Sequence, residues 1–111
     1  MRLSTYDAAT MADQWIYVVR PQRADFVKTR TPIEQKIVAA HFEYLTELLH
    51  ASKLVMAGPC LDGAFGIVVL RTADEAEARA LMGSDPAVQA GVFSAELHPF
   101  RVSLYEKTAL S

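Results

Sequence analysis

A capped amphipathic segment that lies between two β-rich runs constrains the fold of this chain more than any other feature. The segment opens with TPIE, in which Thr31 takes the N-cap position, Pro32 the first helical position, and Glu34 completes a capping box. Apolar residues then recur at steps of three and four, which predicts a helix from about residue 32 to 52. Its expected buried stripe comprises Ile37, Val38, His41, Phe42, Leu45, Leu48 and Leu49.

The rest of the chain divides into β-rich runs and one further helix. A hairpin turn is expected at Asp62-Gly63, and TADE predicts a second helix that runs from Thr72 to about Met82. DPAVQAG predicts a separate short helical turn between Pro86 and Gly91. The polar stretch that follows Pro21 is interpreted as a connection. The expected strands are QWIYVVR (14–20), KLVMAGP (53–59), FGIVVLR (65–71) and VFSAELHPFRVSLY (92–105), the last one long strand or two short ones broken by Pro99.

This order, βαββαβ, is that of a ferredoxin-like α+β domain, a four-stranded antiparallel sheet with two helices. Right-handed crossovers place both helices on one face of the sheet. We expect an irregular lead-in over residues 1–13 and a single domain over 14–111.

Composition excludes several classes of protein. Of the 111 residues, 51% are hydrophobic and 22% charged, which is typical of a globular domain and not of a disordered chain. The net charge of −2, without any block of like charge, gives no basic stripe for nucleic acid. No apolar run is long enough to span a membrane, and the single cysteine, Cys60, has no internal disulfide partner. We therefore expect a cytoplasmic protein that binds neither nucleic acid nor membrane.

Two strands carry more apolar residues than a one-sided sheet needs. IYVV and GIVVL are apolar at consecutive positions, so both faces of each strand are apolar. Each Val, Leu or Ile left in water forgoes about 1.5–3 kcal/mol of burial. A second copy packed sheet to sheet would cover these residues, which predicts a symmetric homodimer through the sheet face.

Two residues are the main candidates for chemistry. His41 lies on the expected buried stripe, where it is either a core histidine with a satisfied hydrogen bond or a proton-transfer group in a cleft. Asp85 precedes Pro86, as an N-cap residue would, but a carboxylate has enough acceptor sites to cap a turn and also accept an imidazole N–H. Such a pair would fix the histidine tautomer and leave the other ring nitrogen as base or acid.

The sequence also indicates whether the site holds a metal or a cofactor and which further residues border it. The three histidines have no ligand-like spacing, so no metal is expected, and no glycine-rich phosphate loop is present, so no cofactor is expected. Cys60 follows a strand end, and a lone cysteine without a base is more often inert. The candidates for binding a small-molecule ligand are Tyr17, Gly58, Pro59, Cys60, Pro86 and Phe93.

HFEYLTELLHASKLVMAGP, followed by DPAVQAGVFSAELHPFRVSL, resembles the YCII-related (YciI-like) family of small bacterial proteins. The resemblance runs from about residue 36 to 105. It implies the dimeric α+β barrel fold and a histidine–aspartate pair in a cleft, here His41 and Asp85. One type of relative is a dehydrochlorinase that acts on a chlorinated hydroxyhydroquinone. The chain departs from the family pattern in a short hairpin, in Ala87, where an aromatic residue is common, and in Val38, where some members have arginine.

These features support two main functions. The first is a small cofactor-independent lyase, isomerase or hydrolase that uses His41 and Asp85 for proton transfer on a small substrate, with aromatic compounds among the candidates. The second is a non-catalytic dimeric module that binds a small metabolite in the same cleft. A cofactor-free monooxygenase is a third alternative, and it would need an aromatic-lined cavity.

Overall fold

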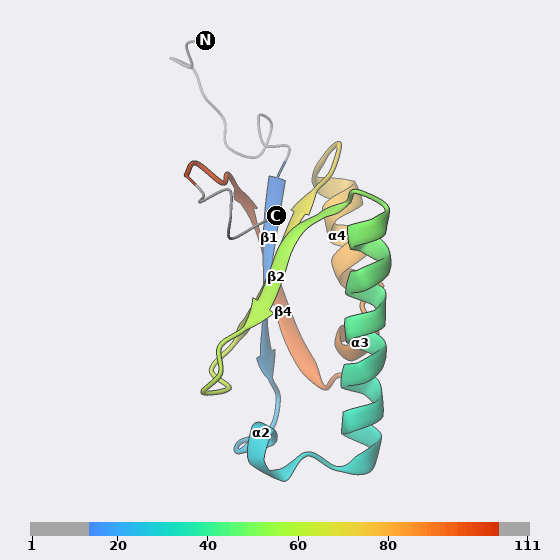
Figure 1. Ribbon diagram of the computed structural model, residues 1–111, viewed down its shortest axis with the longest axis vertical. Coiled ribbons are helices and arrows are strands. Elements are labelled where there is room, and N and C mark those ends of the chain that lie inside the picture. Colours follow the sequence, from blue (N-terminus) through green and yellow to red (C-terminus); the bar gives the residue numbers. More distant parts are fainter. Residues whose placement is uncertain (1–13, 105–111) are drawn as a thin grey trace.

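The computed structural model describes residues 14–104, and the expected lead-in over 1–13 lies outside the described residues. The strands form one antiparallel sheet in the order β2-β3-β1-β4. Helices α3 and α4 lie on the same side of the sheet (Figure 1), as the ferredoxin-like order predicted. The elements are β1 (Gln14–Pro21), α2 (Phe26–Thr29), α3 (Pro32–His50), β2 (Leu54–Pro59), β3 (Gly66–Arg71), α4 (Glu75–Gly83), α5 (Pro86–Gln89) and β4 (Phe93–Phe100).

The core lies between the sheet and the helices. Alternation along β1 points Trp15, Tyr17 and Val19 toward the helices, and all three are buried. Tyr17 pairs with Val68 on one side and with Leu97 on the other, so these residues share its face. Leu45 and Leu48 of α3 and Ala78 of α4 complete this layer. Tyr17 is therefore at the centre of the sheet, directly beneath the helices.

The N-terminus of α3 has the predicted capping box. The Thr31 hydroxyl accepts from the Glu34 amide at 3.1 Å, and the Glu34 carboxylate accepts from the Thr31 amide at 2.9 Å. The helix ends at His50, two residues earlier than expected.

The expected buried stripe of α3 is too wide by two residues. Phe42 is 70% exposed and Leu49 is 51% exposed, so their predicted burial is wrong. At 100° per residue both lie on the same edge of the stripe, about 40–60° from Leu45, whereas Leu48 lies on its other side. That edge of the helix lies beyond its contact with the sheet and faces a cavity.

Two other local predictions need correction. The start of α4 is capped by Asp74, whose carboxylate accepts from the Glu77 amide at 2.9 Å, whereas the Thr72 hydroxyl only donates to the Asp74 carbonyl. DxxE is itself a capping pattern, so the helix starts later than TADE suggested.

The connection after β1 contains a short helix, α2, with Phe26 buried. Four helical residues are too few to show a period in the sequence.

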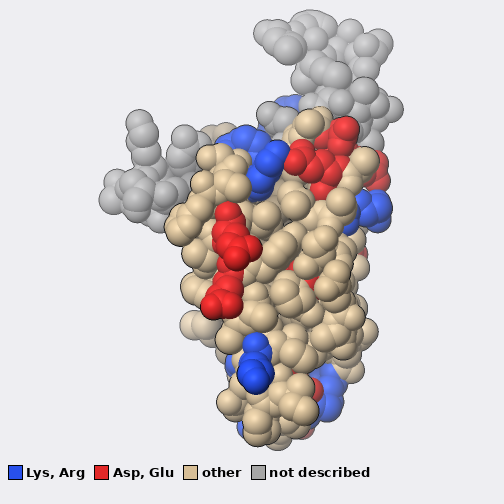
Figure 2. All heavy atoms as spheres, turned by 90° about the vertical axis from the view of Figure 1, so that its right-hand side faces the viewer, with Lys and Arg blue, Asp and Glu red and all other residues tan. Residues whose placement is uncertain are grey.

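The side of the molecule that faces right in Figure 1 carries charges of both signs. They lie in separate small groups around a broad uncharged area (Figure 2).

No helix within residues 14–104 combines the length and apolar character needed to cross a membrane.

Candidate functional site

Asp85 occupies the corner between α4 and α5. It is the N-cap of α5, where its Oδ1 accepts from the Ala87 amide at 3.0 Å, and Pro86 takes the first helical position. The side chain has no exposed surface. The predicted capping role is confirmed, and it holds the carboxylate inside the protein.

Two side chains from distant parts of the chain also contact this carboxylate. Tyr17 of β1 donates its hydroxyl to Asp85 Oδ2 at 2.8 Å. His41 of α3 places Nδ1 2.8 Å from each of the two carboxylate oxygens. The imidazole and the carboxylate are thus direct neighbours, although 44 positions separate them in the sequence.

The protonation pattern follows from these partners. Burial and the nearby Asp85 carboxylate raise the pKa of Tyr17 well above its ordinary value, so Tyr17 stays a hydrogen-bond donor at neutral pH. The same two causes raise the pKa of Tyr44, one helical turn from His41. Because a carboxylate only accepts hydrogen bonds, the His41 proton lies on Nδ1 in the neutral ring, and Nε2 carries the lone pair.

The His41 ring is oriented by an aromatic contact as well. Phe93 of β4 meets it edge to face, with ring centroids 5.4 Å apart and an interplanar angle of 87°. The His41 side chain is 13% exposed, so it is neither a surface residue nor sealed in the core.

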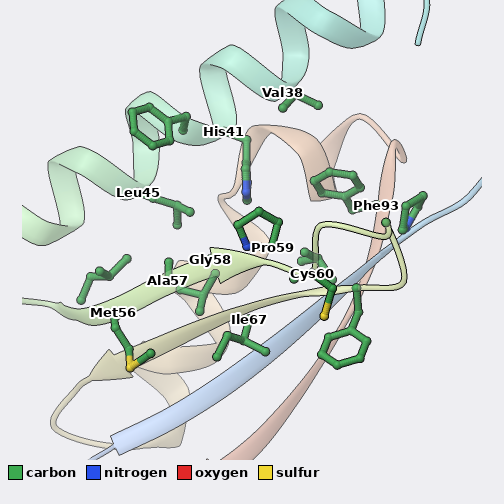
Figure 3. A pocket seen from close by; sticks show the side chains of 18 of the residues that line it. Val38, His41, Leu45, Met56, Ala57, Gly58, Pro59, Cys60, Ile67 and Phe93 are labelled. Carbon is green, nitrogen blue, oxygen red and sulfur yellow. The ribbon is translucent and has the colours of Figure 1, made fainter. Parts of the chain in front are cut away.

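His41 lies on the wall of an open cavity of about 610 Å³. Figure 3 shows its side chain pointing from α3 toward the end of β2, with Pro59 and Cys60 across from it. Most of the wall is aliphatic or aromatic, including Phe26 and the exposed edge of α3. This composition suits a small apolar ring next to a few polar groups.

The sequence-predicted ligand residues divide into two sets. Gly58, Pro59, Cys60 and Phe93 line the cavity beside His41. Tyr17 does not; it is fully buried below the wall and contacts Asp85 instead of the cavity. Pro86 is also absent from the wall and serves as the first residue of α5.

One part of the wall was missed by sequence reasoning. Phe26, Val27 and Arg30 come from the connection after β1 that was interpreted as polar. The hairpin packs against it, since a Cβ on Gly63, at φ +80°, would come within 2.7 Å of Val27 Cγ2. The signal available in the sequence was the adjacent pair Phe26-Val27 in an otherwise polar stretch.

No group of three or more His, Cys, Asp or Glu side chains within residues 14–104 is arranged to hold a metal ion. The side-chain contacts that define the candidate site within these residues are those of Asp85 with His41 and with Tyr17.

A family model described as the YCII-related domain matches residues 15–101. The chain belongs to the YCII-related domain family. The match includes every element of this YCII-related chain from the second residue of β1 to the end of β4, and with them both His41 and Asp85.

Among solved structures, this YCII-related chain is similar to 5-chloro-2-hydroxyhydroquinone dehydrochlorinase (TftG) from Burkholderia phenoliruptrix, in complex with 2,5-dihydroxybenzoquinone. The TM-score is 0.60 at 20% sequence identity, and the alignment covers 78% of this chain and 93% of the other. A likeness at this identity shows the fold, which is the α+β fold predicted from the sequence, an antiparallel sheet with helices on one side (Figure 1). No curated protein matches the sequence.

Proposed function

We propose that this chain is a small enzyme that transfers protons on a small aromatic substrate, with His41 as general base and acid and Asp85 as its positioning residue. The observation that carries the proposal is the buried Asp85 carboxylate 2.8 Å from His41 Nδ1, with the histidine on the wall of an apolar cavity. This chemistry requires no cofactor.

The reaction uses the second nitrogen of the ring. Nε2 takes a proton from a C–H or O–H group of the substrate, and the imidazolium that forms is stabilised by the Asp85 carboxylate. The proton then returns from Nε2 to another substrate atom in an isomerisation, or to the leaving group in an elimination. Asp85 keeps its hydrogen bonds from Tyr17 and Ala87 throughout, so its orientation does not change.

Two observations support an aromatic substrate. The cavity wall contains several phenylalanines, and rings stack on such walls with little loss of conformational freedom. The similar protein TftG is a dehydrochlorinase of a chlorinated hydroxyhydroquinone, whose complex holds 2,5-dihydroxybenzoquinone. The two proteins share the fold, so the substrate class of TftG supports the proposal of an aromatic substrate here.

The test combines a substrate panel with a histidine variant. Small phenols, hydroquinones and quinones, 2,5-dihydroxybenzoquinone among them, are screened for binding by NMR and for conversion by mass spectrometry. For a converted compound, His41→Asn lowers turnover by about 10²–10⁴-fold, the usual contribution of a general base. His50→Asn, at the exposed end of the same helix, leaves turnover unchanged.

The outcome that contradicts catalysis is also defined. Saturable binding in the cavity, without conversion of any bound compound and with the same affinity in His41→Asn, would instead identify a metabolite-binding module. Full turnover by a folded His41→Asn variant would remove His41 from the mechanism.

We further propose that the protein acts as a homodimer through the outer face of the sheet. Ile16 and Val18 of β1 and Ile67 of β3 point away from the helices and are only partly buried. Three branched apolar side chains on adjacent strands form a continuous surface, which a second copy would cover.

A further inference from the structure

Arg30 is the one permanently charged side chain on the cavity wall within residues 14–104. It lies between α2 and α3 and is half-buried, whereas Lys28, two residues earlier, is exposed and does not line the cavity. An arginine on an otherwise apolar wall costs desolvation free energy unless its donors find an acceptor.

Two guanidinium groups lie over the Phe26 ring, and they differ in their partners. Arg23 lies 5.8 Å from the ring centroid and binds both carboxylate oxygens of Glu34, at 3.2 and 2.6 Å. Arg30 lies 5.4 Å from the centroid, and no acceptor for its N–H groups is seen in the part of the chain that the structure describes. The donors of Arg30 are therefore available to a ligand in the cavity.

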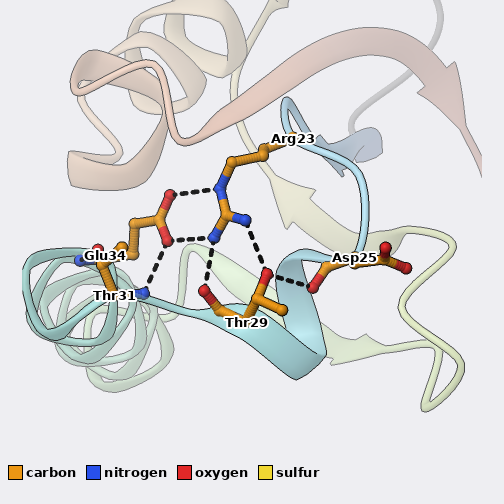
Figure 4. A network of polar contacts seen from close by, with 5 residues as sticks. All are labelled: Arg23, Asp25, Thr29, Thr31 and Glu34. Atoms are coloured by element: carbon orange, nitrogen blue, oxygen red, sulfur yellow. Dashed lines mark hydrogen bonds and ion pairs between the residues drawn. The ribbon is translucent and has the colours of Figure 1, made fainter.

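The backbone on both sides of Arg30 is held by a set of contacts that we call the Arg23 network, made of Arg23, Asp25, Thr29, Thr31 and Glu34 (Figure 4). Arg23 donates to the Thr29 hydroxyl and carbonyl at 2.7 and 2.9 Å, and Glu34 joins Arg23 to the Thr31 amide. Arg30 stands between Thr29 and Thr31, so its backbone is positioned before any ligand binds.

A row of rings connects Arg30 with His41. Arg30 lies over Phe26, Phe26 meets Phe93 at 5.7 Å between centroids, and Phe93 meets His41 at 5.4 Å. All four side chains line the cavity. A cationic group therefore stands on one part of the wall, the proton-transfer group stands on another, and apolar rings lie between them.

From this arrangement we infer that Arg30 binds the carboxylate of an aromatic acid whose ring lies along Phe26 and Phe93, with its reacting atom at His41. The guanidinium fork matches the two oxygens of a carboxylate. The inference deepens the proposed function and rests on it, since it assigns the substrate class of the same site.

The test compares two probes of equal shape, 4-hydroxybenzoate and 4-hydroxybenzamide, by calorimetry or NMR titration. The wild type binds the carboxylate on the order of tenfold more tightly than the amide, as a charge-assisted pair predicts. Arg30→Gln reduces this preference to less than about twofold, and Arg30→Lys keeps part of it because the charge remains without the fork. Lys28→Gln, which removes the same charge from the neighbouring helix, keeps the full preference.

The inference is overturned if Arg30→Gln leaves the preference for the carboxylate over the amide unchanged. It is also overturned if the wild type shows no saturable binding of 4-hydroxybenzoate at ligand concentrations well above about 1 mM. Neither result depends on turnover. The proposed function fails on a different result, full turnover in His41→Asn, so failure of the inference and failure of the proposed function can be told apart.

Discussion

Asp85 has backbone and side-chain partners at the same time. Its Oδ1 caps α5 through the Ala87 amide, and its Oδ2 accepts from Tyr17, while His41 Nδ1 lies against both oxygens. A carboxylate with three donors around it can rotate very little. Capping and positioning are therefore one structural feature, and the cap is what keeps the carboxylate facing His41.

Tyr17→Phe tests whether the buried hydroxyl supports this arrangement. Loss of the donor leaves Asp85 Oδ2 with one partner fewer, and we expect the free energy of unfolding to fall by about 1–3 kcal/mol. Turnover also falls, but by less than in His41→Asn, because Asp85 still contacts the ring. Urea unfolding and turnover of the best panel compound provide the two measurements.

Tyr44→Phe is the matched control for this experiment. Its hydroxyl donates to the Leu81 carbonyl at 2.6 Å and not to Asp85, so it should affect stability without a specific loss of turnover. Equal effects of the two variants on turnover would contradict the role assigned to Tyr17.

Helix α2 shows how a short element can shape a site. It follows Asp25, at φ 57°, and it contributes Phe26 and Val27 to the cavity wall. The Arg23 network connects this helix to the N-terminus of α3. Within the network, Glu34 has a pKa lowered to about 2. The largest cause is the hydrogen bond from Arg23, and the next is the hydrogen bond from the Thr31 amide.

Glu34→Gln should therefore destabilise the protein in a pH-dependent way. The folded-state pKa of Glu34 is below its ordinary value of 4.5, so its stabilisation is fully present above that value. The difference in unfolding free energy between wild type and variant shrinks as the pH falls below 4.5 and disappears near 2. Denaturant unfolding at several pH values between about 7 and 2 measures this trend.

Glutamine at position 34 can still complete the capping box with Thr31, so the variant isolates the pair with Arg23. Glu43→Gln, at an exposed glutamate of the same helix, is the control. A destabilisation that stays constant from neutral to acid pH would contradict the role of the ionised Glu34.

The molecule has two unlike sides, because α3 and α4 cover one face of the sheet and Ile16, Val18 and Ile67 point to the other. Burial of each such side chain would stabilise a dimer by about 1.5–3 kcal/mol. Each side chain contributes twice, because a symmetric dimer contains two copies of it. A single charge on this face should therefore weaken association strongly.

We expect Ile16→Lys to shift the protein from dimer to monomer, with a dissociation constant raised at least about tenfold. Size-exclusion chromatography with light scattering across a concentration series measures it. Ile33→Lys, at an isoleucine of α3 that is 72% exposed, should leave the dimer unchanged. A wild type that is monomeric at micromolar concentration would refute the dimer.

Local signals in the sequence were enough for most of the fold. TPIE predicted the start of α3, Asp62-Gly63 the hairpin, and the run before Pro21 the first strand, because capping, turn and strand preferences act between near neighbours. Their order then predicted the antiparallel sheet with both helices on one side. The same chemistry indicated that Asp85 caps a turn.

Only the tertiary structure decided how those pieces make a site. The contact of His41 with Asp85, the burial of Tyr17 beneath them, and the exposure of Phe42 and Leu49 all depend on which surfaces meet when α3 packs on the sheet. The position of Arg30 on the cavity wall depends in the same way on the folding of α2 against the hairpin. Local sequence preferences do not contain this information, because a side chain's partners across the core are set by packing between segments far apart in the chain.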